Sequence, residues 1–120
     1  MLKNFEKETE KLSEYEKSEI LPILSKILEK TIGKKLALTN SQIVMRYLPG
    51  VGEARVRKVI NYIRNKDIIN GLMATNKGYY IGTSREELKE YIESLEGRIG
   101  AIQRVMQSIK RQMDKMYPPE

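Results

Sequence analysis

The fold of this chain is decided by residues 52–66, which read GEARVRKVINYIRNK. The aliphatic residues recur at spacings of three, one and three, and this pattern places them on one face of an α-helix. They are Val56, Val59, Ile60 and Ile63. At about 100° per residue, Ala54, Lys58, Asn61 and Asn65 fall on the opposite face, and arginines flank that line. The stretch therefore predicts a helix that buries one face and presents cations and amides on the other.

Such an outer face has two interpretations. It is either the solvated side of an ordinary basic helix or a surface that contacts phosphates and base edges. The candidate nucleic-acid-binding residues combine this helix with one lysine further along the chain. They are Arg55, Arg57, Lys58, Asn61, Arg64, Asn65, Lys66 and Lys77.

The composition of the 120 residues narrows the function classes. The formal net charge is +6 and the pI is about 9.5, so an acidic partner is expected, and nucleic acid is the usual one. The chain contains no cysteine and no histidine, which removes thiol nucleophiles, the commonest general base and the commonest metal ligands. We expect no enzyme activity, no cofactor and no metal site.

Targeting signals are also missing from the sequence. No run of about 18 apolar residues could cross a membrane, and the first residues lack the apolar centre of a signal peptide. We expect a cytoplasmic protein without a membrane partner, in the host cytoplasm if a phage encodes it.

The segments beside the basic helix indicate a larger motif. Thr39 and Gln42 have the spacing of a capping box and start a short helix, which ends at the glycine-bearing turn 49–52. After the basic helix, two β-prone runs around Asn76-Lys77-Gly78 predict a hairpin. Three helices followed by a hairpin are the order of a winged helix-turn-helix. The expected fold is mainly α with a small β-hairpin, and the winged helix occupies residues 13–83.

The N-terminal segment is expected to be less ordered. Residues 1–12 contain few apolar side chains, so we expect a flexible or loosely helical arm there. Ser13 and Glu16 again match a capping box, and Pro22 predicts a helix restart or a kink. An amphipathic arm that joins a partner is the alternative for residues 1–12.

Residues 84–120 predict one long helix with a heptad seam. Apolar residues alternate at spacings of four and three, which is typical of a coiled coil. We expect this helix to pair with another copy, although it could instead pack on its own domain or against the N-terminal arm. The first half of the helix is acidic and the second half is basic, which staggered or antiparallel pairing could exploit. The candidate oligomerisation residues are Leu88, Ile92, Leu95, Ile99, Ile102, Met106 and Ile109.

These segments together resemble a family. The resemblance rests on residues 52–64, Lys77-Gly78-Tyr79-Tyr80-Ile81, Glu86-Glu87-Leu88-Lys89-Glu90-Tyr91 and Ser94-Leu95-Glu96-Gly97-Arg98. They are similar to small winged-helix proteins of bacteriophages and prophages, and the similarity covers roughly residues 13–110. It implies that helix 53–66 is a recognition helix and that the turn 75–78 is the wing.

Three functions remain open from the sequence. The first is a non-enzymatic protein, dimeric and regulatory or replication-associated, that contacts duplex DNA, with RNA as another ligand. The second is a phage anti-defence protein of the anti-CRISPR type that binds a host RNA-guided nuclease or its guide RNA. The third is a coiled-coil adaptor.

Overall fold

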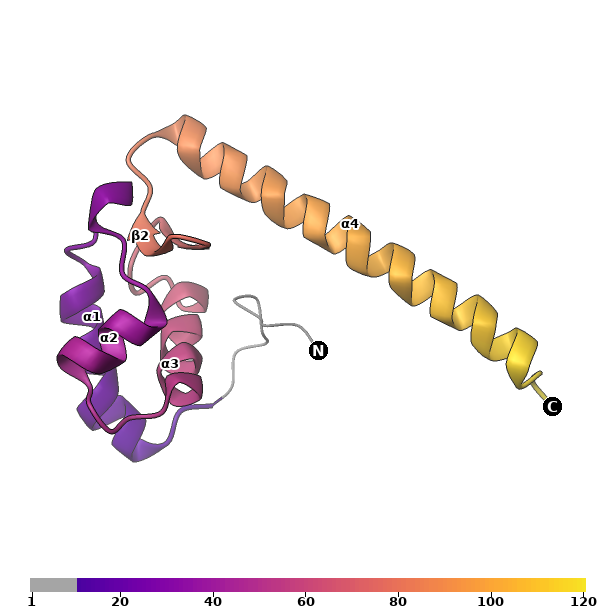
Figure 1. Ribbon diagram of the computed structural model, residues 1–120, viewed down its shortest axis with the longest axis horizontal. Helices are drawn as coiled ribbons and strands as arrows, with labels where there is room; N and C mark the ends of the chain where they lie inside the picture. The colour runs from indigo at the N-terminus through magenta and orange to yellow at the C-terminus, as the bar shows by residue number, and fades with distance from the viewer. Residues whose placement is uncertain (1–10) are drawn as a thin grey trace. The chain divides into compact units, whose positions relative to one another are not determined.

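The computed structural model describes residues 11–120 (Figure 1). Most of the predicted arm, residues 1–10, lies outside the described part of the chain. The protein is mainly helical, with a two-stranded antiparallel hairpin and a long C-terminal helix, which confirms the expected fold class at this level. Contacts divide the chain into one unit that ends at Thr83 and a second unit that begins at Ser84.

The first helical segment begins with a capping box, as its sequence predicts. The Ser13 N–H donates to Glu16 Oε1 at 2.8 Å, and the Glu16 N–H donates to Ser13 Oγ at 3.2 Å. A π-helical turn, η1 (Glu16–Ile20), then leads into α1 (Leu21–Leu28). Pro22 lies in the first turn of α1, where its missing N–H removes no helical hydrogen bond. The residues on both sides of the junction keep helical backbone angles, so the π-helical turn accommodates the proline within one continuous helix.

Helices α2 (Asn40–Tyr47) and α3 (Glu53–Asn65) follow the 3-10 turn η2 (Lys34–Leu36). Both hydrogen bonds of the capping box predicted for Thr39 and Gln42 are present. α3 packs against α1, α2 and η1, so it is the central helix of this unit. Its four aliphatic residues are fully buried, as the 3.6-residue period predicts.

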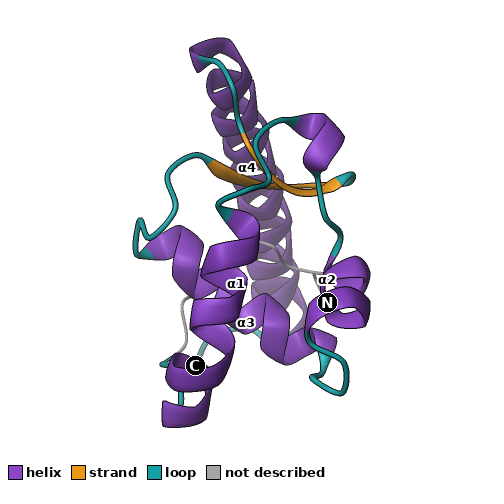
Figure 2. Ribbon diagram, turned by 90° about the vertical axis from the view of Figure 1, so that its left-hand side faces the viewer, coloured by secondary structure: helices purple, strands orange, loops and turns teal. Residues whose placement is uncertain are grey.

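The hairpin consists of β1 (Leu72–Thr75) and β2 (Gly78–Ile81), drawn in orange in Figure 2. Met73 lies opposite Tyr80, and Ala74 lies opposite Tyr79. The outer edge of β2 is also paired. Leu38 exchanges two backbone hydrogen bonds with Tyr79, at 2.8 and 3.1 Å. The segment before α2 thus adds a one-residue third strand to the hairpin.

Gly78 permits this pairing. Its φ is +115°, and a Cβ at this position would lie 2.6 Å from the carbonyl carbon and oxygen of Leu38. Only glycine fits a backbone that approaches so closely in that conformation. The hairpin turn and the segment before α2 are therefore held together through a residue without a side chain.

The second unit contains α4 (Arg85–Met116), a single helix of 32 residues. Ser84 caps it by accepting a hydrogen bond from the Glu87 N–H at 3.1 Å. Along α4, all of which the structure describes, no residue is buried. None of the helices within residues 11–120 combines the length and the apolar character that crossing a membrane requires.

We expect Gly78→Ala to lower the free energy of unfolding by at least about 2 kcal/mol, because the new Cβ meets backbone atoms at a positive φ. Chemical denaturation followed by circular dichroism measures this change. Gly50→Ala is the matched control, since Gly50 has a similarly positive φ of +85° but nothing within 4 Å of its added Cβ. Equal losses in the two variants would contradict the steric explanation.

Candidate nucleic-acid interface

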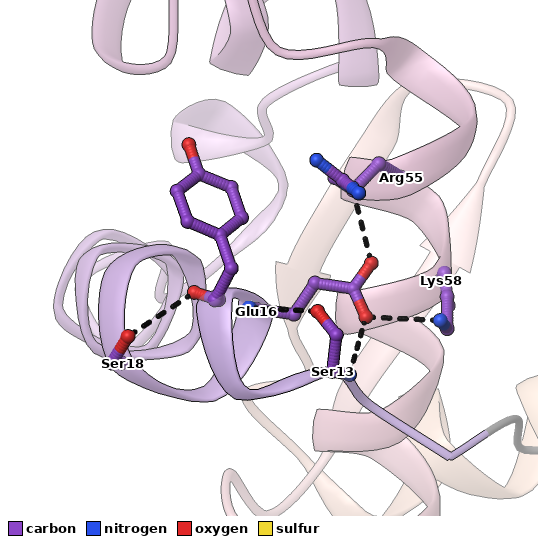
Figure 3. A network of polar contacts seen from close by, with 6 residues as sticks. Ser13, Glu16, Ser18, Arg55 and Lys58 are labelled. Carbon is purple, nitrogen blue, oxygen red and sulfur yellow. Dashed lines mark hydrogen bonds and ion pairs between the residues drawn. The ribbon is translucent and has the colours of Figure 1, made fainter.

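The predicted interface contains a buried acidic residue, Glu16, which lies between two of the predicted cations, Arg55 and Lys58. The side chain of Glu16 is only 3% exposed, and it lies between Arg55 and Lys58 of α3 (Figure 3). Lys58 Nζ donates to Glu16 Oε1 at 2.9 Å, and Arg55 Nε lies 3.2 Å from Oε2. The Arg55 guanidinium also lies over the ring of Tyr15, 5.3 Å from its centroid.

These contacts keep Glu16 ionised. Burial alone would raise the pKa of its carboxyl group, because desolvation disfavours the charged form. The backbone N–H of Ser13 and the ammonium of Lys58 outweigh this effect and hold the pKa of Glu16 below its ordinary value. A carboxylate that stays charged neutralises part of the positive face of α3.

Asn61 does not face outward, so its predicted role in base recognition is wrong. The residue is only 2% exposed. Arg64 Nη1 lies at 3.5 Å from Asn61 Oδ1, and Asn65 Nδ2 donates to the Asn61 carbonyl at 2.8 Å. The helical wheel assumes one buried face, but α3 packs against three neighbouring helical segments and therefore buries more of its circumference.

The remaining candidates differ in exposure. Arg57 and Arg64 are partly exposed, whereas Asn65 and Lys66 at the end of α3 are exposed. Lys77 is exposed at the hairpin tip, where its N–H donates to Thr75 Oγ1 at 3.1 Å. The side chains of Arg55 and Lys58 are 50% and 25% exposed but are engaged by Glu16. The structure thus leaves a smaller set of surface cations than the sequence predicts.

The positive charge is unevenly distributed along the chain. Residues 11–83 contain thirteen basic and six acidic residues, a net charge of +7. Residues 84–120 contain seven of each and are neutral overall. The net positive charge of residues 11–120 therefore lies in the helical and hairpin unit and not in residues 84–120.

A second feature of this unit is a pocket of about 540 Å³ formed by α1, α2 and the segment between them. Its apolar lining comes mainly from Ile23, Ile27, Leu36 and Leu38. The basic side chains of the lining are Lys26, Lys30 and Arg46, and no acidic residue lines the pocket. The pocket is therefore apolar inside with a surplus of positive charge.

The sequence contained one overlooked signal for the Glu16 contacts. A glutamate at the third position of a capping box is placed near the backbone, and Ile20, one helical turn later, is apolar. An apolar residue four positions after a glutamate lies on the same side of the helix, and in the structure Ile20 is buried. The packing partner of that side could not be identified from the sequence.

The chain matches no family model, no curated protein and no solved structure. Among residues 11–120, no three acidic side chains cluster so that they could hold a metal ion.

We expect Glu16→Gln to destabilise the fold by about 1–3 kcal/mol at pH 7, because Lys58 loses its charged partner. The pKa of Glu16 is lowered by folding, so its contribution is complete above about pH 4.5 and is lost as the pH falls through the lowered value. The variant should therefore lose less stability than the native protein between pH 5 and pH 3. Denaturant titrations across this range measure both effects.

Glu14→Gln is the matched control for this experiment. Glu14 lies in the same segment, but its side chain is 96% exposed. Its ion pair with Lys17 is long, at 3.9 Å. An exposed pair of this kind contributes little. A loss of stability as large as that of Glu16→Gln would contradict the assignment of the effect to the buried carboxylate.

Proposed function

We propose that the protein is a non-enzymatic nucleic-acid-binding protein of the winged-helix type, with duplex DNA as the favoured ligand. The observation that carries this proposal is the pairing of Leu38 with Tyr79. It joins the hairpin to the segment that leads into α2, so Lys77 and the surface cations of α3 belong to one unit. A rigid arrangement of this kind fits a regularly spaced row of phosphates.

The order of the elements supports the same proposal. A helix, a short strand at Leu38, two helices separated by a glycine-bearing turn and a hairpin follow one another. This is the order of a winged helix-turn-helix, in which the helix before the hairpin enters the major groove. In this chain that helix is α3, and the turn Asn76–Lys77 is the wing.

The burial of the candidates revises which of them contact the ligand. Arg57, Arg64, Lys66 and Lys77 are the cations that contact phosphates in this proposal. Arg55 and Lys58 share the carboxylate of Glu16, which offsets one of their two charges, and Asn61 is buried. Asn65 is the one amide of the original set at the surface. Binding therefore depends mainly on phosphates, with weak discrimination between sequences.

The salt dependence tests this mechanism. Four neutralised phosphates predict that log affinity falls against log salt with a slope of about −3 to −4. Replacing both Lys66 and Lys77 by alanine should reduce the magnitude of this slope by about two and weaken binding to all duplexes alike. Fluorescence anisotropy with labelled random duplexes between about 50 and 300 mM salt measures both quantities.

The matched control replaces Arg111 and Lys115 by alanine, which removes the same charge from a part of α4 outside its apolar seam. Both side chains are exposed, so the change in net charge is equivalent. If the two double variants reduced the slope equally, binding would reflect the net charge of the protein and not the proposed interface. A duplex affinity independent of salt would contradict the proposal as a whole.

A second candidate function is binding to a host protein, as expected for a phage anti-defence protein. The pocket between α1 and α2 favours it, because an apolar interior with three basic side chains suits an amphipathic segment that carries acidic residues. Arg46→Glu should then abolish binding of an acidic amphipathic helical peptide in an anisotropy titration. The Lys66 and Lys77 double variant should retain this binding, which separates the candidate from the nucleic-acid interface.

A further inference from the structure

α4 carries an apolar stripe that nothing in its own unit covers. Eight large apolar residues between Ile92 and Met116 are between 47% and 65% exposed, and Leu95 among them along the helix is partly buried. The eight are Ile92, Ile99, Ile102, Val105, Met106, Ile109, Met113 and Met116. A contiguous exposed apolar surface of this length marks an interaction site.

The helix itself needs a partner surface. Gly97 and Gly100 each cost about 1 kcal/mol relative to alanine in a helix. Neither lies in the 4-3 pattern of apolar residues, and an added Cβ at Gly97 would meet nothing within 4 Å. The two glycines thus weaken the isolated helix and leave its apolar seam uninterrupted, so burial of the seam against a partner would stabilise α4.

The distribution of charge selects the orientation of a partner helix. Residues 84–96 contain five glutamates, Arg85 and Lys89, a net charge of −3. Residues 97–116 contain five basic residues and Asp114, a net charge of +4. A parallel second copy would place like charges together along both halves, whereas an antiparallel copy can place the end of the acidic half, with Glu93 and Glu96, beside the basic half of the other helix.

The 4-3 spacing allows two antiparallel registers in which eight seam residues of one helix face eight seam residues of the other. The registers differ in where the two-fold axis crosses α4. When the axis lies between Gly100 and Ala101, Lys89 lies beside the partner's Lys110, and the like charges repel. In the other, centred at Arg104, Glu96 lies beside the partner's Lys110. The exposed Val105 then meets its own copy next to the two-fold axis.

We propose that α4 forms an antiparallel coiled coil with α4 of a second copy, centred at Arg104. The facing seam pairs are Ile92 with Met116, Leu95 with Met113, Ile99 with Ile109, and Ile102 with Met106. Glu96 and Lys110 form two symmetric ion pairs at the edges of this seam. This inference concerns residues 84–120 alone and does not depend on the nucleic-acid proposal for residues 11–83.

The mass in solution is the first test. Light scattering or sedimentation of the full chain should give twice the chain mass of 13.9 kDa. Ile99→Lys with Ile102→Lys should convert the protein to a monomer while the helical and hairpin unit remains folded by circular dichroism. A native protein that is monomeric at 100 μM would overturn the proposal.

Disulfide trapping tests the orientation, and the absence of native cysteine makes it unambiguous. A mixture of Glu96→Cys and Lys110→Cys chains should form a mixed disulfide. Ile92→Cys chains should not cross-link to each other, because these positions are about 36 Å apart in the antiparallel register at 1.5 Å per residue. Self-cross-linking of Ile92→Cys without the mixed disulfide would indicate parallel pairing and overturn the orientation.

Charge reversal tests the register without cross-linking. Glu96→Lys and Lys110→Glu should each weaken dimerisation about ten-fold, because each reversal creates two like-charge pairs. Combining them should restore the dimer to within about two-fold of the native affinity, since the two ion pairs re-form with opposite polarity. The absence of rescue in the combined variant would overturn the register centred at Arg104.

Discussion

The fold of the N-terminal unit depends on the contact of Glu16 with α3. This carboxylate is withdrawn from water and is stabilised by the Ser13 N–H, by Lys58 and by Arg55. It thereby ties the start of the first helical segment to the central helix. Loss of Lys58 would leave this buried charge with less compensation, which is more costly than loss of an exposed ion pair. The orientation of η1 across α3 is therefore fixed by electrostatics as well as by apolar packing.

The same contact limits the surface that α3 offers to a ligand. A helix with five basic residues in and after it resembles a uniform positive face when only its sequence is considered. In the structure, Glu16 offsets one of the two positive charges of Arg55 and Lys58 from within the protein. Positive charge remains toward the end of the helix and at the hairpin tip. The division between structural and available cations thus arises from one acidic residue about forty positions earlier in the chain.

Local patterns predicted most of the fold, because they depend on neighbouring residues. The capping boxes at Ser13 and Thr39, the hairpin turn at Lys77 and the start of α4 after Ser84 all lie where the sequence places them. Long-range packing could not be predicted in this way. The burial of Asn61 and the pairing of Leu38 with Tyr79 depend on which segments meet in space, and no local spacing records that.

The pairing of Leu38 with Tyr79 also has a consequence for the order of folding. These residues are separated by α2, α3 and β1, so their hydrogen bonds close a loop of about forty residues. Closing a loop of this length costs chain entropy before the contact is gained, whereas α2, α3 and the hairpin turn form from nearby residues. The short third strand is therefore expected to join the hairpin late, after the helices have brought its two ends together. The edge of β2 remains open until then, and the interval before this closure is the stage at which the chain is most exposed to pairing with other molecules.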